Sequence, residues 1–134
     1  MNIDRRTMLT GGTSLAVAAM CGEQLLAGES VKSKLPKGAI VLLAQLQAKA
    51  GEEEAVGKAL LAMVGPTRKE SGCLCYNLHQ SKKDKSQFMF YEQWASAEAL
   101  AAHGKSSHMA TMQQAIDGRI VKGGATAFDL LEVT

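Results

Sequence analysis

Side chains that could take part in chemistry are concentrated in one short segment, residues 88–109. It contains Trp94, the only Trp of the chain, and two of the three His, His103 and His108. Trp94 ends a predicted strand and His103 lies about two helical turns further on, so both could line a gap between a sheet and a helix. The segment therefore suggests a small pocket, although a structural His and a core Trp would give the same pattern.

The two His of this segment are poorly spaced for a shared metal ion. They are five residues apart, which is about 140° around a helix, and Gly104 stands between them. The chain also contains no GxGxxG, GxxxxGK[ST], CxxC or HExxH pattern. We therefore expect neither a bound cofactor nor a metal site.

The elements that would position these side chains follow from hydrophobic periodicity. Runs of alternating or continuous apolar residues predict strands, and apolar residues at three- and four-residue spacings predict helices. Ser96 is a plausible N-cap for the helix that carries His103, and Gly104 should interrupt that helix. The predicted elements are a strand at 39–49, a helix at 50–72, strands at 73–81 and 86–94, helical segments at 96–107 and 106–120, and a strand at 125–133.

This order of elements, β, α, β, β, α, β, matches the ferredoxin-like α+β unit, an antiparallel four-stranded sheet with two helices on one face. The other sheet face would be bare in a monomer. We expect it to be too apolar for water and to be buried against a second copy, which would give a homodimer with a dimeric α+β barrel. The residues expected there are one of two alternating sets, either Leu74, Tyr76 and Leu78 or Phe88, Phe90, Glu92 and Trp94.

The first 34 residues differ in character from the rest of the chain. A charged start with Arg5 and Arg6 precedes an apolar run of small residues that is too short for a permanent membrane span. The two Arg are followed by a free position, an apolar residue and Leu, which resembles the twin-arginine export motif. We therefore expect residues 1–34 to be an export signal and linker, residues 35–134 to form one domain, and the protein to reach the periplasm.

Charge and cysteine content narrow the range of partners. The formal net charge is +2 and no basic stripe recurs on a helix face, so nucleic acid is not an expected partner. The Lys-rich residues 82–85 fit a solvated hairpin turn. Cys73 and Cys75 would lie on the same face of a strand with parallel Cβ vectors, so we expect two free packing cysteines and not a disulfide between them.

Two stretches, ESGCLCYNLHQS and FMFYEQWASAEALAAHGKSSHM, form a pattern together with the closing apolar strand. This pattern resembles the antibiotic biosynthesis monooxygenase (ABM) domain family, the group that includes quinol monooxygenases. The resemblance extends from about Gly38 to Val133. Its most specific residues are Glu92, Trp94, Ser96, Ala99, Leu100, His103 and His108, with Gly72 and Tyr76 as a second anchor.

The resemblance implies a dimeric α+β barrel that oxidises quinol- or anthrol-type aromatics with O₂, without flavin, haem or metal. An electron-rich hydroxyarene, once deprotonated, can give an electron to O₂ itself, so the protein need only position it, remove a proton and exclude water. A neutral His is a suitable base, and an Asn, Tyr or Trp donor can stabilise the oxyanion. The implied roles are His103 as base, Trp94 as pocket wall or N–H donor, Tyr76 or Asn77 as alternative donors, and His108, Glu92 and Phe90 as substrate-binding residues.

Other activities occur on the same fold. Haem-degrading relatives combine a strand-end Trp with a helix His, but they also have an Asn on the first strand. The first strand here reads LLAQLQ and has no Asn, so haem degradation is the less expected activity. A small-molecule isomerase of a phosphorylated sugar derivative and a non-catalytic ligand-binding dimer are the remaining alternatives. Phosphate capture would require several convergent cations, yet Arg68 and Arg119 are the only Arg after residue 34.

Overall fold

The computed structural model describes residues 35–128, and the predicted export signal lies outside this range. The described elements are β1 (Ile40–Ala48), α1 (Glu53–Arg68), β2 (Cys73–Gln80), β3 (Gln87–Trp94), α2 (Ala97–Gly104), α3 (Ser107–Ile116) and β4 (Ile120–Phe128).

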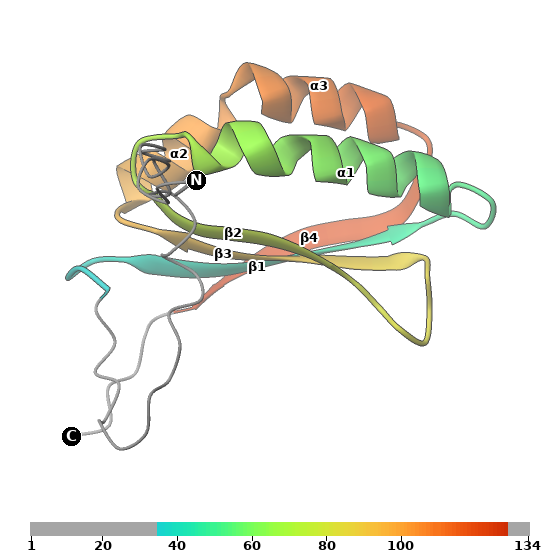
Figure 1. The fold of residues 1–134 in the computed structure, drawn as a ribbon, viewed down its shortest axis with the longest axis horizontal. Coiled ribbons are helices and arrows are strands. Elements are labelled where there is room, and N and C mark those ends of the chain that lie inside the picture. The colour runs from blue at the N-terminus through green and yellow to red at the C-terminus, as the bar shows by residue number, and fades with distance from the viewer. Residues whose placement is uncertain (1–34, 129–134) are drawn as a thin grey trace, which may run out of the picture.

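The four strands form one antiparallel sheet in the order β2-β3-β1-β4, and the helices lie together on one face of it (Figure 1). This arrangement confirms the predicted ferredoxin-like α+β fold. Two short helices, α2 and α3, take the place of the second helix, as the predicted break at Gly104 implies. None of the helices within residues 35–128 is long and apolar enough to cross a membrane.

The core forms where the apolar stripe of α1 meets the sheet. Val56, Leu60 and Met63 repeat at three- and four-residue spacings, so they share one helix face, and all three are buried. Opposite them lie alternate side chains of β3, including Phe88 and Phe90. The same alternation carries Trp94 into the core at the end of the strand. The helix stripe and the strand alternation therefore bring Trp94 to the helix side of the sheet.

The residues that we predicted for the bare sheet face do not lie there. Tyr76 on β2 and the alternate residues of β3 from Phe88 to Trp94 are buried on the helix face. A bulge between Cys73 and Cys75 shifts the alternation of β2, which a regular two-residue period could not reveal. The opposite side, here called the open sheet face, carries the intervening residues Val41, Leu43, Gln45, Asn77, His79, Met89, Tyr91 and Gln93.

The last strand also begins earlier than predicted, at Ile120 instead of residue 125. Gly123 and Gly124 lie in its middle, and glycine is a poor strand former, so the sequence pattern favours a later start. The backbone of β4 pairs with β1 from Ile120 to Phe128, and these ladder hydrogen bonds do not depend on side chains. The predicted end of the strand at residues 129–133 lies outside the described residues.

Gly72 joins α1 to β2 in a conformation that other residues rarely adopt. Its φ is +83°, and a Cβ at this position would stand 2.6 Å from the Cβ of Ala99 on α2. Gly51 has a similar φ of +86°, but a Cβ added there would have no neighbouring atom within 4 Å. Gly72 therefore lets α2 approach the start of β2 closely.

We predict that Gly72→Ala lowers the free energy of unfolding by at least about 1 kcal/mol more than Gly51→Ala does. Both substitutions carry the cost of a positive φ, about 1–2 kcal/mol, but only Gly72→Ala adds a clash with α2. Urea unfolding of both variants measures the difference. Equal losses would show that the approach of α2 does not require glycine.

Candidate functional site

Two serine N-caps, Ser96 and Ser106, mark where α2 and α3 begin. The side chain of Ser96 accepts a hydrogen bond from Ala99 N at 3.2 Å and starts α2. The side chain of Ser106 accepts from Met109 N at 3.2 Å and starts α3. Because the backbone turns at Ser106, His103 at the end of α2 and the first turn of α3 no longer follow one helical repeat.

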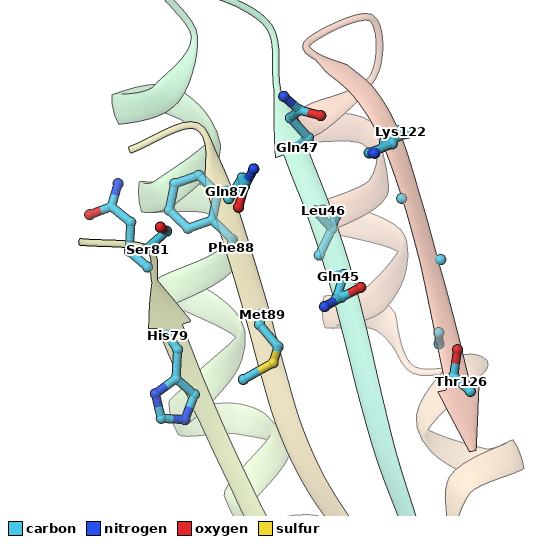
Figure 2. Close-up of a pocket in the computed structure, with 14 residues that line it drawn as sticks. Gln45, Leu46, Gln47, His79, Ser81, Gln87, Phe88, Met89, Lys122 and Thr126 are labelled. Carbon is cyan, nitrogen blue, oxygen red and sulfur yellow. The ribbon is translucent and has the colours of Figure 1, made fainter. Parts of the chain in front are cut away.

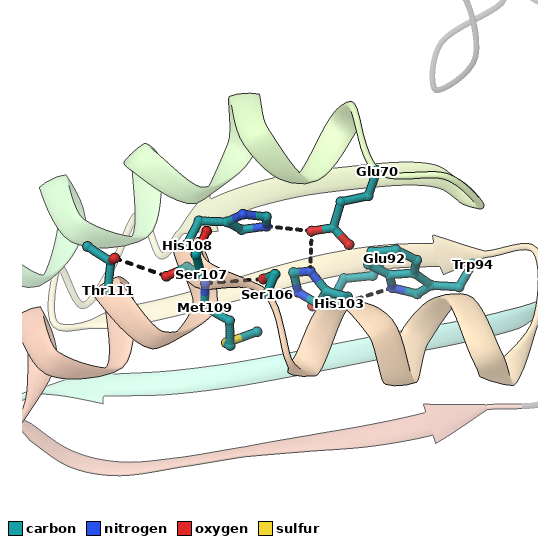
Figure 3. Close-up of polar contacts among 9 residues, drawn as sticks. All are labelled: Glu70, Glu92, Trp94, His103, Ser106, Ser107, His108, Met109 and Thr111. Carbon is teal, nitrogen blue, oxygen red and sulfur yellow. Dashed lines mark hydrogen bonds and ion pairs between the residues drawn. The ribbon is translucent and has the colours of Figure 1, made fainter.

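The two His of this region converge on one carboxylate, Glu70, in the turn between α1 and β2 (Figure 3). His103 Nδ1 lies 2.8 Å from Glu70 Oε1, and His108 Nε2 makes a second, short contact with the same oxygen. The centroids of the two rings are 5.9 Å apart. Glu70, His103 and His108 are called the carboxylate–imidazole cluster below.

This convergence corrects the expectation that His103 and His108 are poorly placed to share an ion. The 140° separation holds for a continuous helix, and the helix is broken between the two residues. The sequence pattern does not point to Glu70. This residue follows α1 by two positions and opens the stretch ESGCLCYNLHQS, but local periodicity does not connect it with residues more than thirty positions later.

His103 is buried and has one ring nitrogen unpartnered. Its side chain is 3% exposed, and Nε2 makes no hydrogen bond with any of the described residues. Its ring lies 4.7 Å, centroid to centroid, from the ring of Trp94 at an interplanar angle of 32°. The ring is therefore held by Glu70 on one nitrogen and by an aromatic surface, while the buried Nε2 has no hydrogen-bond partner among the described residues.

A second buried carboxylate, Glu92, lies next to this aromatic surface. Trp94 Nε1 donates a hydrogen bond to Glu92 Oε2 at 2.8 Å, and Glu92 is only 3% exposed. Burial raises the pKa of Glu92, and the hydrogen bond from Trp94 and the nearby His103 oppose that rise. The indole N–H predicted as a donor to substrate is thus occupied within the protein.

Tyr76 completes the aromatic surface. Its ring centroid lies 4.7 Å from Phe90 and 5.4 Å from His103. Burial, followed by the negative charge of Glu92, raises the pKa of Tyr76 well above its usual value, so the phenol remains protonated at neutral pH. The Tyr76 ring therefore packs beside His103 with its hydroxyl in the protonated form.

Asn77, the neighbour of Tyr76, points to the open sheet face, as strand alternation requires. Its side-chain oxygen accepts a hydrogen bond from Arg68 Nη2 at 2.6 Å, and Arg68 Nε donates to the Tyr76 carbonyl at 2.9 Å. Of the site residues predicted from the sequence, the structure brings together Tyr76, Phe90, Glu92, Trp94, His103 and His108, and it places Asn77 apart from them.

The two strand cysteines behave differently. Cys73 is free and half-buried, and burial, with the negative charges of Glu70 and Glu92, raises the pKa of its thiol to about 11. Cys75 takes part in a disulfide, so the expectation of a free thiol at that position is wrong. Because Cys73 is free, the two cysteines do not pair with each other, as strand geometry predicted.

A separate groove of about 660 Å³ lies over the strands (Figure 2). Gln45, Met89 and His79 line it from three adjacent strands, in register across the open sheet face. Lys122 and Thr126 of β4 extend it to the sheet edge. None of the groove residues belongs to the cluster around His103.

The sequence around the cluster matches that of a known family. The family model described as antibiotic biosynthesis monooxygenase (ABM) matches residues 39–115, more than half of the chain. The chain belongs to this family. The matched range includes α1, the β2–β3 hairpin, α2 and nearly all of α3, and therefore every residue of the carboxylate–imidazole cluster.

One curated relative and two solved structures are similar to this chain. Rv0793 from Mycobacterium tuberculosis, named as a candidate monooxygenase, is 32% identical over 69 residues, which cover 52% of this chain and 67% of Rv0793. The structure of Rv0793 superposes with a TM-score of 0.67 at 24% identity, covering 72% of this chain and 98% of Rv0793. The crystal structure of PA3566 from Pseudomonas aeruginosa gives a TM-score of 0.68 at 30% identity, covering 71% of this chain and 96% of PA3566.

We predict that Trp94→Phe lowers the free energy of unfolding by about 1–3 kcal/mol, because it leaves the buried Glu92 carboxyl without its N–H donor. The loss of indole volume adds to this cost. A double-mutant cycle separates the two effects: in a Glu92→Leu background the same Trp94→Phe substitution should cost at least about 1 kcal/mol less. Equal costs in both backgrounds would show that the hydrogen bond does not contribute.

Proposed function

We propose that this member of the ABM family is a cofactor-independent monooxygenase that oxidises a quinol- or anthrol-type aromatic with O₂. The observation that carries the proposal is the state of His103, which is oriented through Nδ1 by Glu70 and has Nε2 unpartnered inside an aromatic surround. This is the arrangement of a general base: a carboxylate fixes the ring and its tautomer, and the other nitrogen receives the proton.

The Glu70 contact decides which nitrogen of His103 can act. When Nδ1 carries the proton and donates it to the carboxylate, Nε2 has a free lone pair. Proton transfer from a substrate hydroxyl to Nε2 would produce an imidazolium beside the negative charge of Glu70, which stabilises it. The burial of Nε2 keeps bulk water away from this proton.

In the proposed reaction the deprotonated hydroxyarene transfers electrons to O₂. At a ring CH₂ or CH position, one oxygen atom is retained as a carbonyl and the other leaves as water. The substrate therefore supplies the electrons, and no external reductant is consumed. The protein contributes the base, the position of the substrate and the exclusion of water.

The other site residues take supporting roles in this proposal. Trp94 provides the wall against which His103 stacks, because its N–H is bound to Glu92. Tyr76 is the better placed hydroxyl donor for a developing oxyanion, since Asn77 lies on the opposite side of the sheet. His108 and Glu70 form the more exposed side of the site, at 22% and 18% side-chain exposure.

We predict that the purified protein consumes O₂ with some members of a panel of hydroquinones and anthrols, above their rate of autoxidation. His103→Gln should reduce that uptake at least about 100-fold, the usual contribution of a general base. The matched control is His79→Gln, which changes the same residue type on the open sheet face. An oxygen electrode measures the rates, and circular dichroism verifies that each variant is folded.

Two results would contradict the proposal. Unchanged uptake by His103→Gln would remove His103 from the mechanism. No protein-dependent uptake by the unmodified chain across the panel would exclude oxidation of this substrate class and favour a ligand-binding or isomerase function on the same fold.

We also propose that the protein forms a homodimer through the open sheet face. Phe128 is 45% exposed and is in register with Val41 on this face, and Leu43 and Tyr91 are paired two positions further along the same face. An apolar side chain of this size at a sheet edge supports burial against a second copy.

Phe128→Asp should convert the dimer into a monomer, because it places a charge in the proposed interface. Leu61→Asp is the control, since Leu61 is 63% exposed on α1, on the helix side of the sheet. Size-exclusion chromatography with light scattering measures the mass of both variants. A monomeric unmodified chain, or a Phe128→Asp variant that remains dimeric, would contradict this interface.

Export to the periplasm through the twin-arginine route remains part of the proposal. It is supported by the sequence alone, through Arg5, Arg6 and the short apolar run that follows them. An exported enzyme would act on aromatic substrates that reach the periplasm.

A further inference from the structure

The carboxylate–imidazole cluster has the composition of a metal site. His103 Nδ1, His108 Nε2 and a Glu70 carboxylate oxygen all lie within 4.8 Å of one another. They come from three separate segments, the end of α2, the first turn of α3 and the turn after α1. We propose that these three residues bind a divalent first-row transition ion, with Zn²⁺, Co²⁺ and Fe²⁺ as the class of ion that fits.

The donor atoms select this class of ion. Imidazole nitrogen suits Zn²⁺, Co²⁺ and Fe²⁺, whereas Ca²⁺ and Mg²⁺ take oxygen ligands and would find only one carboxylate here. Two His and one carboxylate leave coordination positions open for water or a substrate oxygen, as in catalytic zinc and non-haem iron sites. One negative charge among the three ligands leaves a bound divalent ion with a net positive charge.

The donor atoms lie within 4.8 Å of one another, so side-chain rotations of up to about 1.5 Å bring them to metal distances. Zn–N and Zn–O bonds of about 2.0–2.1 Å in a tetrahedral site place neighbouring ligand atoms about 3.3 Å apart. His103 Nδ1 and Glu70 Oε1 are 2.8 Å apart. To reach the spacing of about 3.3 Å, the carboxylate oxygen must move away from His103 by about half an ångström. Glu70 and His108 are partly exposed, so they can rotate, while the buried His103 stays fixed against Trp94.

The exposures of the three ligands also define an entry path. His103 is 3% exposed, and Glu70 and His108 are 18% and 22% exposed. An ion can therefore arrive from the side of Glu70 and His108 and keep water on that side. The buried side is closed by the Trp94 ring, which fixes the orientation of the His103 ligand as outer-shell groups do in known metal sites.

Metal binding would change what His103 can do. When Nδ1 binds the ion, the ring proton resides on Nε2, so Nε2 becomes a donor and cannot accept a proton. The ion should therefore inhibit turnover that uses His103 as a base. This consequence rests on the proposed monooxygenase function, whereas the metal site itself does not.

The test measures binding directly, on the full chain after treatment with a chelator and removal of that chelator. Zn²⁺ is titrated by calorimetry, and Co²⁺ is titrated by its visible absorption. We expect one ion per chain, and we expect Glu70→Gln and His108→Gln each to weaken binding at least about 10-fold, in line with the loss of a ligand. His79→Gln is the matched control and should bind with unchanged affinity.

Several results would overturn the site. These are a stoichiometry far below one ion per chain, equal affinity in the unmodified chain and in Glu70→Gln and His108→Gln, or binding that is lost in His79→Gln. Binding that survives His108→Gln but disappears in Cys73→Ser would assign the ion to the thiol instead.

Turnover gives a second readout that separates the two proposals. If both hold, Zn²⁺ suppresses O₂ uptake by the unmodified chain, and a higher Zn²⁺ concentration is needed in His108→Gln. If the calorimetric binding is present but no uptake is detected with any substrate, the metal site stands and the monooxygenase proposal fails. If uptake is present and no ion binds, the reverse holds.

Discussion

One carboxylate oxygen, Oε1 of Glu70, is shared by two imidazoles, and the arrangement of the site depends on this contact. It connects the turn after α1 with the end of α2 and the start of α3. An ionised carboxylate only accepts hydrogen bonds, so each imidazole must present a proton to it. The chemistry of the cluster is therefore decided by what lies between the three donor atoms, either the protons of His103 and His108 or a metal ion.

The sheet supplies the rigid half of the site. Trp94 is fully buried at the end of β3, its N–H is bound to Glu92, and its ring supports His103. Tyr76 on the neighbouring strand contacts the same imidazole from another side. A functional group held between packed rings and a carboxylate loses little conformational entropy when it binds a ligand. His108 and Glu70 are the more exposed members of the cluster.

Much of the fold is predictable because it rests on local periodicity. The alternation of apolar residues in β1 and β3, the apolar stripe of α1 and the Ser96 cap of α2 are each contained in a few consecutive residues. The start of β4 is not predictable in this way, because Gly123 and Gly124 disfavour a strand and only pairing with β1 imposes one. The bulge in β2 likewise depends on its partner strand.

For the site, the sequence by itself determined which side chains are chemically capable and where two of them lie, with Trp94 at a strand end and His103 on the helix that follows. Only the tertiary structure decided that Glu70 joins them and that His108 turns back toward the same carboxylate. The physical reason is that the side-chain pattern of a helix or strand extends over a few residues, whereas hydrogen bonds to an ionised group form between any segments that packing brings within about 3 Å. Burial of Trp94 and the restart of the helix at Ser106 produce that packing.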